Sequence, residues 1–476
     1  MNKGVNEPDR VFNPRTVAVV GDKREMGYMW LKSLSTFQGK LYSVQIDPNE
    51  LAGIEALGVE NHSSLLDIPE PVDYVVIAVP RAVTPRIVAD CVEKGVGGVT
   101  LFTSGFAETN TEEGIRLQRQ LTEMARAAGL NLIGPNCMGI FNPRIGVRHS
   151  PDQYAGEGGS AGFISQSGTI ATFFGLAGAL NGVKVSKSVS YGNAIVLDST
   201  DFLEYLAQDE QTKIIGMYIE GLKDGRRFFD CLKRVAREKP VFIWKGGDTE
   251  AGTRATASHT ASMAESPAIW QALMRQSGAI KVDNLDEMID TAKLLLHARP
   301  VAGDRVGLVA ATGGQSVAIS DAFAKAGLRV PCLSQDSYQE LASFFDIIGA
   351  SYQNPFDVSS NLRSLENVLR ILDILDGDEN IDSVVLEFSI FLLARWMMDP
   401  QSLDGFLDGL ARFKARSTKP FLTVLVSVHM EERASEVRHK LTQRDIPCFP
   451  SFERGAGALR KMVDYYRFRQ AEGVPV

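Results

Sequence analysis

The stretch T-V-A-V-V-G (residues 16–21) decides the fold of this chain, because a short apolar run ends at a glycine. Similar runs follow, among them V-D-Y-V-V-I-A-V at 72–79, and the others lie at 40–46, 98–102 and 130–133. Helical patterns separate them, for example at 81–94. Apolar strands that alternate with helices are typical of a parallel sheet covered on both faces. The pattern predicts a Rossmann-like first domain.

The same alternation returns twice further along the chain. Strand-like runs of a second series lie at 162–165, 185–190, 214–219 and 240–244. Those of a third series lie at 305–310, 383–387, 420–425 and 447–450. A chain of 476 residues is also too long for one core. We therefore predict three parallel α/β domains in tandem, covering residues 1–148, 149–299 and 300–476.

Composition narrows the kinds of partner and compartment. The net charge is −8 and no run of five basic residues occurs, which argues against a nucleic-acid surface. The five cysteines form no C-x-x-C pair, which favours a reducing compartment and disfavours structural zinc. The chain has neither an apolar run of about 18 residues nor a signal-peptide pattern at its start. A cytoplasmic protein without a membrane segment is expected.

The first glycine loop, G-D-K-R-E-M-G at 21–27, lacks the G-x-G-x-x-G spacing of dinucleotide-binding proteins. A turn from a strand into a helix points backbone N–H groups at an anion, so the loop is able to receive a pyrophosphate or an adenine nucleotide. The alternative is that Gly21 merely makes the turn. The loop by itself leaves both interpretations open.

Small polar or acidic groups follow three strands of the second series. They occur in S-Q-S-G (165–168), S-Y-G-N (190–193) and I-E-G (219–221). Because the carboxyl ends of parallel strands meet at one edge, we expect the residues of these motifs to line one crevice, namely Ser167, Gly192, Asn193 and Glu220. The helix that follows Ser165 offers free N–H groups to a phosphoryl group or a carboxylate. The alternative for Ser165 is a simple helix cap.

The small, polar loop at 246–266 carries His259 between Ser258 and Thr260. One interpretation is a solvated surface histidine. The other is a nucleophile: a carboxylate such as Glu220 that accepts from one ring N–H leaves the other nitrogen ready to take a phosphoryl group. Other chemistries fit less well, since the chain has no G-x-S-x-G elbow, no Walker A motif and no histidine pair with metal-ligand spacing.

Several of these motifs together resemble the ADP-forming acyl-CoA synthetases, or acetate–CoA ligases, and more distantly the succinyl-CoA synthetases. The resemblance extends from about Pro14 to Arg469. It rests on I-G-P-N-C-M-G-I-F-N-P (133–143), F-I-S-Q-S-G (163–168), S-Y-G-N (190–193), Y-I-E-G-L-K-D-G-R-R-F (218–228), K-G-G-D-T-E-A-G-T-R-A (245–255), S-H-T (258–260) and N-P-F-D-V (354–358).

The resemblance implies a Rossmann-like CoA-binding domain followed by two flavodoxin-like domains. His259 is then the phosphorylated histidine and Glu220 its orienting carboxylate, and no metal ligand is expected in this chain. The residues implied to contact CoA are Gly21, Lys23, Gly27, Pro80, Pro135, Asn136 and Cys137. Those implied to contact phosphate or substrate are Ser165, Gln166, Ser167, Gly168, Gly192, Asn193, Gly313 and Gly314.

The family reaction converts ATP, a carboxylic acid and CoA into acyl-CoA, ADP and phosphate, through phosphohistidine and an acyl phosphate. ATP and Mg²⁺ bind an ATP-grasp unit that this chain lacks. The resemblance therefore implies an α subunit that pairs with a separate ATP-grasp β subunit in a hetero-oligomer and acts on a small carboxylic acid. The bulky side chains of Met138, Phe141 and Tyr191 indicate a non-minimal acid pocket.

The chain departs from the family pattern near His259. Two glycines expected in the motif S-H-T-G-x-L-A-G are replaced by Ala261 and Glu265. These changes keep open an alternative function, a non-catalytic acyl-CoA-binding or sensing subunit of the same fold. A third possibility, an NAD-dependent dehydrogenase, is disfavoured by the missing G-x-G-x-x-G spacing.

Overall fold

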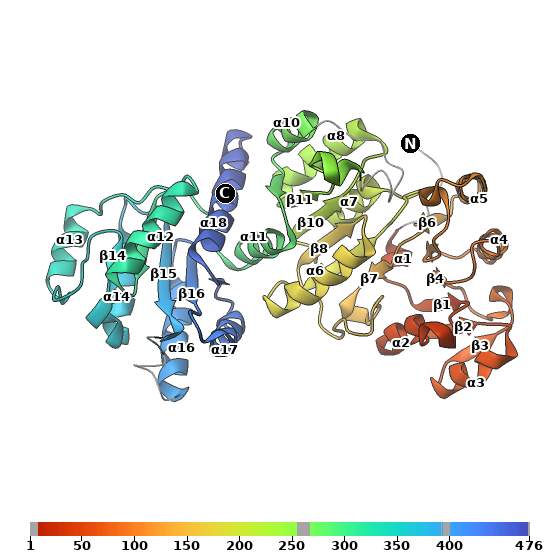
Figure 1. Ribbon diagram of the computed structural model, residues 1–476, viewed down its shortest axis with the longest axis horizontal. Helices are drawn as coiled ribbons and strands as arrows, with labels where there is room; N and C mark the ends of the chain where they lie inside the picture. Colours follow the sequence, from red (N-terminus) through yellow and green to blue (C-terminus); the bar gives the residue numbers. More distant parts are fainter. Residues whose placement is uncertain (1–7, 255–266, 392, 394–399, 475–476) are drawn as a thin grey trace. The chain divides into compact units, whose positions relative to one another are not determined.

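A computed structural model describes residues 8–254, 267–391, 393 and 400–474 of the chain. Within these ranges the strands form three sheets (Figure 1). The chain divides into two compact units, one comprising residues 1–179 and 183–285 and the other residues 180–182 and 286–476. The fold class, α/β with mostly parallel sheets, is confirmed. The boundaries of the three predicted domains stay a prediction.

The first sheet of unit 1 is parallel throughout. Its strands, in spatial order, are β3 (Glu60–His62), β2 (Lys40–Val44), β1 (Thr16–Val20), β4 (Tyr74–Ile77), β5 (Gly98–Leu101) and β6 (Asn131–Ile133). Along β1, Val17 and Val19 belong to one core and Ala18 and Val20 to another, since successive side chains of a strand point to opposite faces. Burial on both faces explains why the run is apolar throughout.

Helices α4 (Thr84–Lys94) and α5 (Glu112–Ala128) lie side by side on this sheet (Figure 1). The start of α5 is fixed by Thr111, whose hydroxyl accepts from the N–H of Gly114. Its end is fixed by Gly129 in the left-handed conformation, at φ +64°. The remaining helices of the first segment are short: α1 (Asp9–Phe12), α2 (Met29–Ser33) and α3 (Pro48–Ala56).

The second sheet of unit 1 contains two strands that the sequence pattern did not predict, at residues 139–141 and 280–282. In spatial order its strands are β12 (Ile280–Val282), β11 (Val241–Lys245), β10 (Ile214–Ile219), β8 (Ala161–Ser165), β9 (Val185–Ser190) and β7 (Gly139–Phe141). All pairs are parallel except β7, which runs antiparallel to β9. The chain thus passes from the last strand of the first sheet directly to the edge of the second. Its helices are α6 (Gly168–Leu180), α7 (Ser199–Gln208), α8 (Gly225–Glu238) and α10 (Pro267–Ser277).

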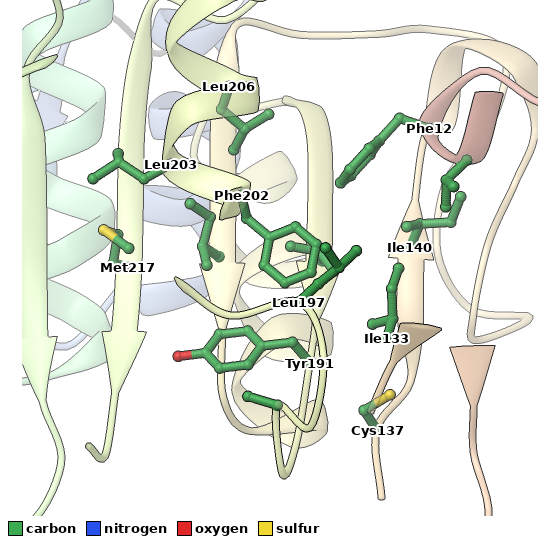
Figure 2. Packing of buried hydrophobic residues seen from close by; sticks show 14 of the residues in the cluster. Phe12, Ile133, Cys137, Ile140, Tyr191, Leu197, Phe202, Leu203, Leu206 and Met217 are labelled. Atoms are coloured by element: carbon green, nitrogen blue, oxygen red, sulfur yellow. The ribbon is translucent and has the colours of Figure 1, made fainter. Parts of the chain in front are cut away.

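One continuous apolar core joins the two sheets of unit 1 (Figure 2). The first sheet and its neighbouring segments contribute Phe12 and Ile133, and the second sheet and its neighbouring segments contribute Ile140, Tyr191 and Phe202. The ring of Phe12 also stacks on that of Tyr205, with centroids 4.3 Å apart. Because packed interiors deform little, this core fixes the strand ends of the two sheets relative to each other.

Unit 2 contains the third sheet, which is parallel throughout. Its strands in spatial order are β14 (Phe356–Asp357), β13 (Val306–Ala310), β15 (Ser383–Ser389), β16 (Phe421–Val426) and β17 (Cys448–Phe449). Helix α12 packs beside α18, and α14 beside α16. The helices of the unit are α11 (Leu285–His297), α12 (Gly313–Lys325), α13 (Gln335–Ala342), α14 (Leu365–Gly377), α16 (Pro400–Arg416), α17 (Glu431–Thr442) and α18 (Phe452–Ala471). None of the helices in the described ranges is long and apolar enough to cross a membrane.

Candidate functional site

A close backbone crossing forms one wall of the site. Gly192, which follows β9, has φ +51°, and a Cβ at this position would lie 2.2 Å from the carbonyl oxygen of Pro135. The next residue, Asn193, donates its N–H to the same oxygen at 3.0 Å. Only glycine fits such an approach. The segment after β9 is therefore fixed against the segment after β6.

The side chain of Asn193 anchors this wall to the first sheet. It is buried, and its amide nitrogen donates to Glu108 Oε2 at 2.6 Å and to Gln118 Oε1 at 3.1 Å. The other oxygen of Glu108 accepts from the N–H of Gly105. Asn193 thus serves mainly to position the backbone that lines the site.

The turn from β8 into α6 is shaped by its own serines. The hydroxyl of Ser165 donates to the carbonyl of Ser167 at 2.6 Å and accepts from its N–H at 3.2 Å. The hydroxyl of Ser167 in turn accepts from the N–H of Ile170 at 3.4 Å, as a helix cap does. A Cβ at Gly168, the first residue of α6, would lie 2.6 Å from Met138 Cγ. Ser165 therefore has a structural role, and the helix start lies close to the segment after β6.

Gln166 joins the ends of two neighbouring strands. Its side-chain oxygen accepts from the N–H groups of Glu220 (2.8 Å) and Gly221 (3.1 Å) at the end of β10. The side chain of Glu220 is buried, and Tyr218 donates its hydroxyl to Glu220 Oε1 at 3.3 Å. Lys245 donates its ammonium group to the carbonyl oxygen of Glu220 at 2.9 Å. Gln166 and Glu220 are thus brought together at one edge of the sheet, although Glu220 does not line the cavity as the strand-end rule predicted.

These segments line an open cavity of about 380 Å³ in unit 1. Seven of the predicted site residues line it: Asn136, Cys137, Gln166, Ser167, Gly168, Gly192 and Asn193. Three other predicted site residues do not line the cavity but make hydrogen bonds to residues that do: Pro135, Ser165 and Glu220. The remaining lining residues are Phe102, Met138, Thr169, Thr172 and Phe173.

The sequence interpretation missed part of this lining and misplaced two aromatic residues. Thr169, Thr172 and Phe173 share one face of α6 through the i, i+3, i+4 spacing, a signal that was available from the sequence. Phe102 follows β5 at a strand end. The pocket role expected of Phe141 and Tyr191 is corrected: both are buried in the core and neither lines the cavity, whereas Met138 does.

The cavity is electrically neutral in its described lining, which contains no lysine, arginine or histidine. Burial raises the pKa of the Cys137 thiol to about 12, so that this sulfur stays protonated at neutral pH. Figure 2 shows its side chain beside the shared core. We therefore interpret Cys137 as a residue that lines the cavity and not as a nucleophile.

A hydrogen-bonded chain behind α6 holds the helix start. The oxygen of the Gln153 side chain accepts from the N–H of His149, so its amide nitrogen faces His149 Nε2 at 3.2 Å as the donor. The proton of His149 then lies on Nδ1, which donates to the hydroxyl of Thr172 at 3.4 Å, and Thr172 donates to the carbonyl of Gly168 at 3.0 Å. Burial lowers the pKa of His149 to about 3, so the ring is neutral.

The glycine loop of the first sheet forms a tight turn at the carboxyl end of β1. Gly21 has φ +86°, and a Cβ there would lie 2.5 Å from Val79 Cγ1, while Gly27 ends a short 3₁₀ turn at φ +65°. Lys23 is half-buried within the turn. Pro80, in contrast, is exposed beyond the end of β4. The first sheet thus brings these predicted CoA contacts to its carboxyl edge.

The second predicted phosphate site, Gly313 and Gly314, opens α12 in unit 2. Thr312 caps the helix by accepting from the N–H of Gln315. A buried carboxylate lies close by: Glu387 Oε2 accepts from the N–H of Ala311 at 2.8 Å, and Oε1 has no hydrogen-bond partner in the described part of the chain. Burial raises the pKa of Glu387 to about 7.

His259, together with Ala261 and Glu265, lies outside the described residues. The role of His259 as the phosphorylated histidine stays a prediction from the sequence. Across the described ranges, no group of three or more His, Cys, Asp or Glu side chains is arranged to hold a metal ion.

Two known protein families match successive parts of the first 295 residues. Residues 15–143 match a family described as a CoA binding domain, and residues 158–295 match a succinyl-CoA ligase-like flavodoxin domain. Fold and site thus define a protein of the CoA-ligase type.

Relatives that match nearly the whole chain narrow the class of CoA ligase. The chain is 35% identical over 459 residues to the α subunit of ADP-forming acetate–CoA ligase II from Pyrococcus furiosus, covering 96% of this chain and 97% of the relative. It is 32% identical to the α subunit of ligase I from the same organism, covering 97% and 98%. The chain belongs to the family of ADP-forming acetate–CoA ligase α subunits. These relatives favour the ligase interpretation over a non-catalytic acyl-CoA sensor.

Solved structures agree with this assignment. Acetyl-coenzyme A synthetase 1 of Candidatus Korarchaeum cryptofilum, solved with phosphate and ADP, is 27% identical and superposes with a TM-score of 0.84, covering 99% of this chain and 100% of that one. A protein from Pyrococcus horikoshii is 30% identical with a TM-score of 0.82, covering 98% and 100%.

Proposed function

We propose that this chain is the α subunit of an ADP-forming acyl-CoA synthetase, which makes acyl-CoA from a small carboxylic acid, CoA and ATP. The observation that carries the proposal is the cavity of about 380 Å³ where the segments after β6, β8 and β9 meet. Its neutral, partly apolar wall suits the acyl group and the thiol end of CoA. The names and full-length similarity of the relatives support the same activity.

The described residues assign separate tasks around the cavity. The N-terminal turn of α6 presents the N–H group of Gly168, which suits a phosphoryl or carboxylate oxygen. The amide nitrogen of Gln166, held by its anchored oxygen, is a neutral donor at the same edge. Asn136 and Cys137 form the wall next to the thiol end, where Cys137 excludes water without reacting.

The reaction has two half-reactions in this proposal. In one, a His259 ring nitrogen takes the γ-phosphoryl group of ATP, and ADP leaves. In the other, a carboxylate oxygen of the acid attacks phosphohistidine, the N–P bond breaks, and the acyl phosphate then loses phosphate when the CoA sulfur attacks its carbonyl carbon. Glu220 orients His259 as an acceptor for one ring N–H. Gly313 and Gly314 contribute N–H groups to the phosphoryl group.

The ATP half-reaction requires a second protein. ATP and Mg²⁺ bind a separate ATP-grasp β subunit in this proposal, which makes the enzyme a hetero-oligomer. The α-subunit names of the full-length relatives support a partner. So does the length of a relative such as acetate–CoA ligase I of Archaeoglobus fulgidus, of which this chain spans only 54%.

Reconstitution with the ATP-grasp partner tests the activity. The purified chain and its partner are mixed with ATP, Mg²⁺, CoA and a panel of small carboxylic acids, and nucleotides and thioesters are quantified by chromatography. We expect acyl-CoA and ADP in equal amounts, dependent on both proteins. Formation of AMP, or thioester formation without the partner, would contradict the proposal.

A further inference from the structure

The turn at residues 21–27 is already occupied by acidic groups of the protein itself. Asp22 is buried, and its carboxylate accepts from the N–H of Lys23 at 3.1 Å and from the N–H of Leu31 at 2.9 Å. Leu31 belongs to the short helix α2, so Asp22 satisfies backbone donors that a helix start leaves open. Desolvation raises the pKa of this carboxyl group, as expected for a buried acid.

A second carboxylate reaches the turn from α3. Glu50 Oε2 accepts from the N–H of Arg24 at 2.8 Å and from the hydroxyl of Tyr28 at 2.8 Å. The position of the Tyr28 ring depends on a glycine of α3. A Cβ at Gly53 would lie 2.0 Å from the hydroxyl oxygen of Tyr28, so a larger residue at this position would displace the tyrosine. Glu50 is half-buried, in contrast to Asp22.

Carboxylate and phosphate oxygens compete for the same backbone donors, because both are anionic hydrogen-bond acceptors. We propose that Glu50 is a specificity-determining residue of the CoA site: its carboxylate takes the place of a ligand phosphate at the N–H of Arg24 and leaves when a phosphate binds. This inference rests on the proposed function, in which the turn receives phosphate groups of CoA.

The structure indicates which of the two acidic residues stays in place when a phosphate binds, Asp22, and which one moves, Glu50. Asp22 bonds two N–H groups of its own segment from a buried position, so its removal would unfold the turn. Glu50 projects from the surface of α3 on a flexible side chain and bonds the turn through one N–H and one hydroxyl. Releasing it requires only a change of rotamer. Glu50 consequently weakens the binding of phosphorylated ligands while it holds the turn in shape without them.

Calorimetric titration of the full chain tests this inference. Four proteins are compared: wild type, Glu50→Gln, Tyr28→Phe and Glu55→Gln. Glutamine keeps an acceptor for Arg24 but lacks the charge. Glu55 is the matched control, since it is exposed on the same helix and its side chain makes no hydrogen bond to the turn in the described structure. The ligands are CoA, adenosine 3′,5′-bisphosphate and pantetheine, the last of which has no phosphate.

We expect Glu50→Gln to bind CoA and the bisphosphate about fivefold more tightly, because the phosphate then displaces a neutral acceptor from the N–H of Arg24 and not a charged one, which bonds more strongly. Tyr28→Phe gives a smaller gain in the same direction, and the gain shrinks at high salt. Glu55→Gln and all pantetheine titrations match wild type. Equal or weaker CoA binding by Glu50→Gln, or a similar gain with pantetheine, overturns the inference alone. If none of the four proteins binds CoA, the proposed function falls together with it.

Discussion

The side-chain oxygen of Gln166 accepts a hydrogen bond from the backbone N–H of Glu220 at 2.8 Å, which joins the ends of β8 and β10 beside the cavity. The oxygen also accepts from Gly221, so the orientation of the amide group is fixed. Its nitrogen makes no hydrogen bond to the described residues, although Gln166 lines the cavity. One side chain thus both shapes the edge of the sheet and offers a donor to a bound oxygen.

Two substitutions of Gln166 separate these tasks. Gln166→Ala removes the anchor and the donor, whereas Gln166→Glu keeps oxygens for Glu220 and Gly221 but replaces the donor by a charge. We expect both to lower turnover by about 10²-fold, the usual cost of losing a donor to a developing anion. Steady-state kinetics with the partner subunit provide the measurement. Full activity of Gln166→Glu would show that only the anchor matters.

Gly192→Ala tests the backbone crossing that forms the wall of the cavity. The added Cβ would meet the carbonyl of Pro135 at 2.2 Å, in a backbone conformation with positive φ. We expect unit 1 to lose about 3 kcal/mol or more of unfolding free energy. Gly225→Ala is the control, because a Cβ in that helical position meets nothing within 4 Å. Urea titration followed by fluorescence should give a lower unfolding midpoint for Gly192→Ala than for Gly225→Ala. Equal unfolding midpoints for the two variants would contradict the close contact between Gly192 and Pro135.

His149 makes unit 1 sensitive to acid. Burial lowers its pKa from 6.5 to about 3, so the unfolded chain binds a proton that the folded chain does not. Stability is therefore complete above pH 6.5 and falls as the pH drops toward 3, by about 2 kcal/mol at pH 5. Hydrogen exchange of α6 across this range measures the loss.

The variant His149→Asn checks the cause of that sensitivity. Asparagine retains a donor in the position of Nδ1 but has no group that titrates. Its exchange rates between pH 5 and 7, after correction for the intrinsic rate, should change less than those of wild type. A wild-type profile without acid sensitivity, or an equally sensitive variant, would contradict the buried neutral histidine.

Glu387 gives unit 2 the opposite dependence on pH. Burial raises its pKa from 4.5 to about 7, so between these values the folded chain holds a proton that the unfolded chain lacks. Stability therefore declines as the pH rises from about 4.5 to 7 and stays lower above it. Glu387→Gln, which keeps an acceptor for Ala311, should stabilise α12 by about 2–3 kcal/mol at pH 8 and little at pH 4. Hydrogen exchange of α12 reports this difference, and an equal effect at both pH values would refute it.

Strands with strong local patterns could be predicted from the sequence. The runs at β1, β9 and β10 were predicted to the residue, because each is mostly apolar or small and ends at or just before a glycine, serine or glutamate. The three-residue strand β7 could not be, since its stability comes from pairing with β9 and not from its own pattern. Short elements that depend on tertiary contacts leave no periodic signal.

The candidate site likewise contains residues that could be predicted from the sequence and residues that could not. Ser167, Gly192 and Asn193 were predicted together because parallel strand ends converge. The use of Ser165 for the turn, and of Asn193 as an anchor to Glu108, depends on side-chain directions that the sequence does not specify. Glu50 was missed for the same reason, since its contact with Arg24 requires α3 to pack against the turn.

We propose that this chain carries a phosphoryl group on His259 and passes it between an acid and the partner subunit. The most direct test of this proposal is to incubate the purified chain alone with radiolabelled phosphate and a panel of acyl-CoAs, then to ask whether it acquires an acid-labile, alkali-stable label. We expect labelling without ATP in the wild type and none in His259→Ala. Label that persists in His259→Ala, or a wild type that stays unlabelled with every acyl-CoA and also with ATP and the partner, would contradict it.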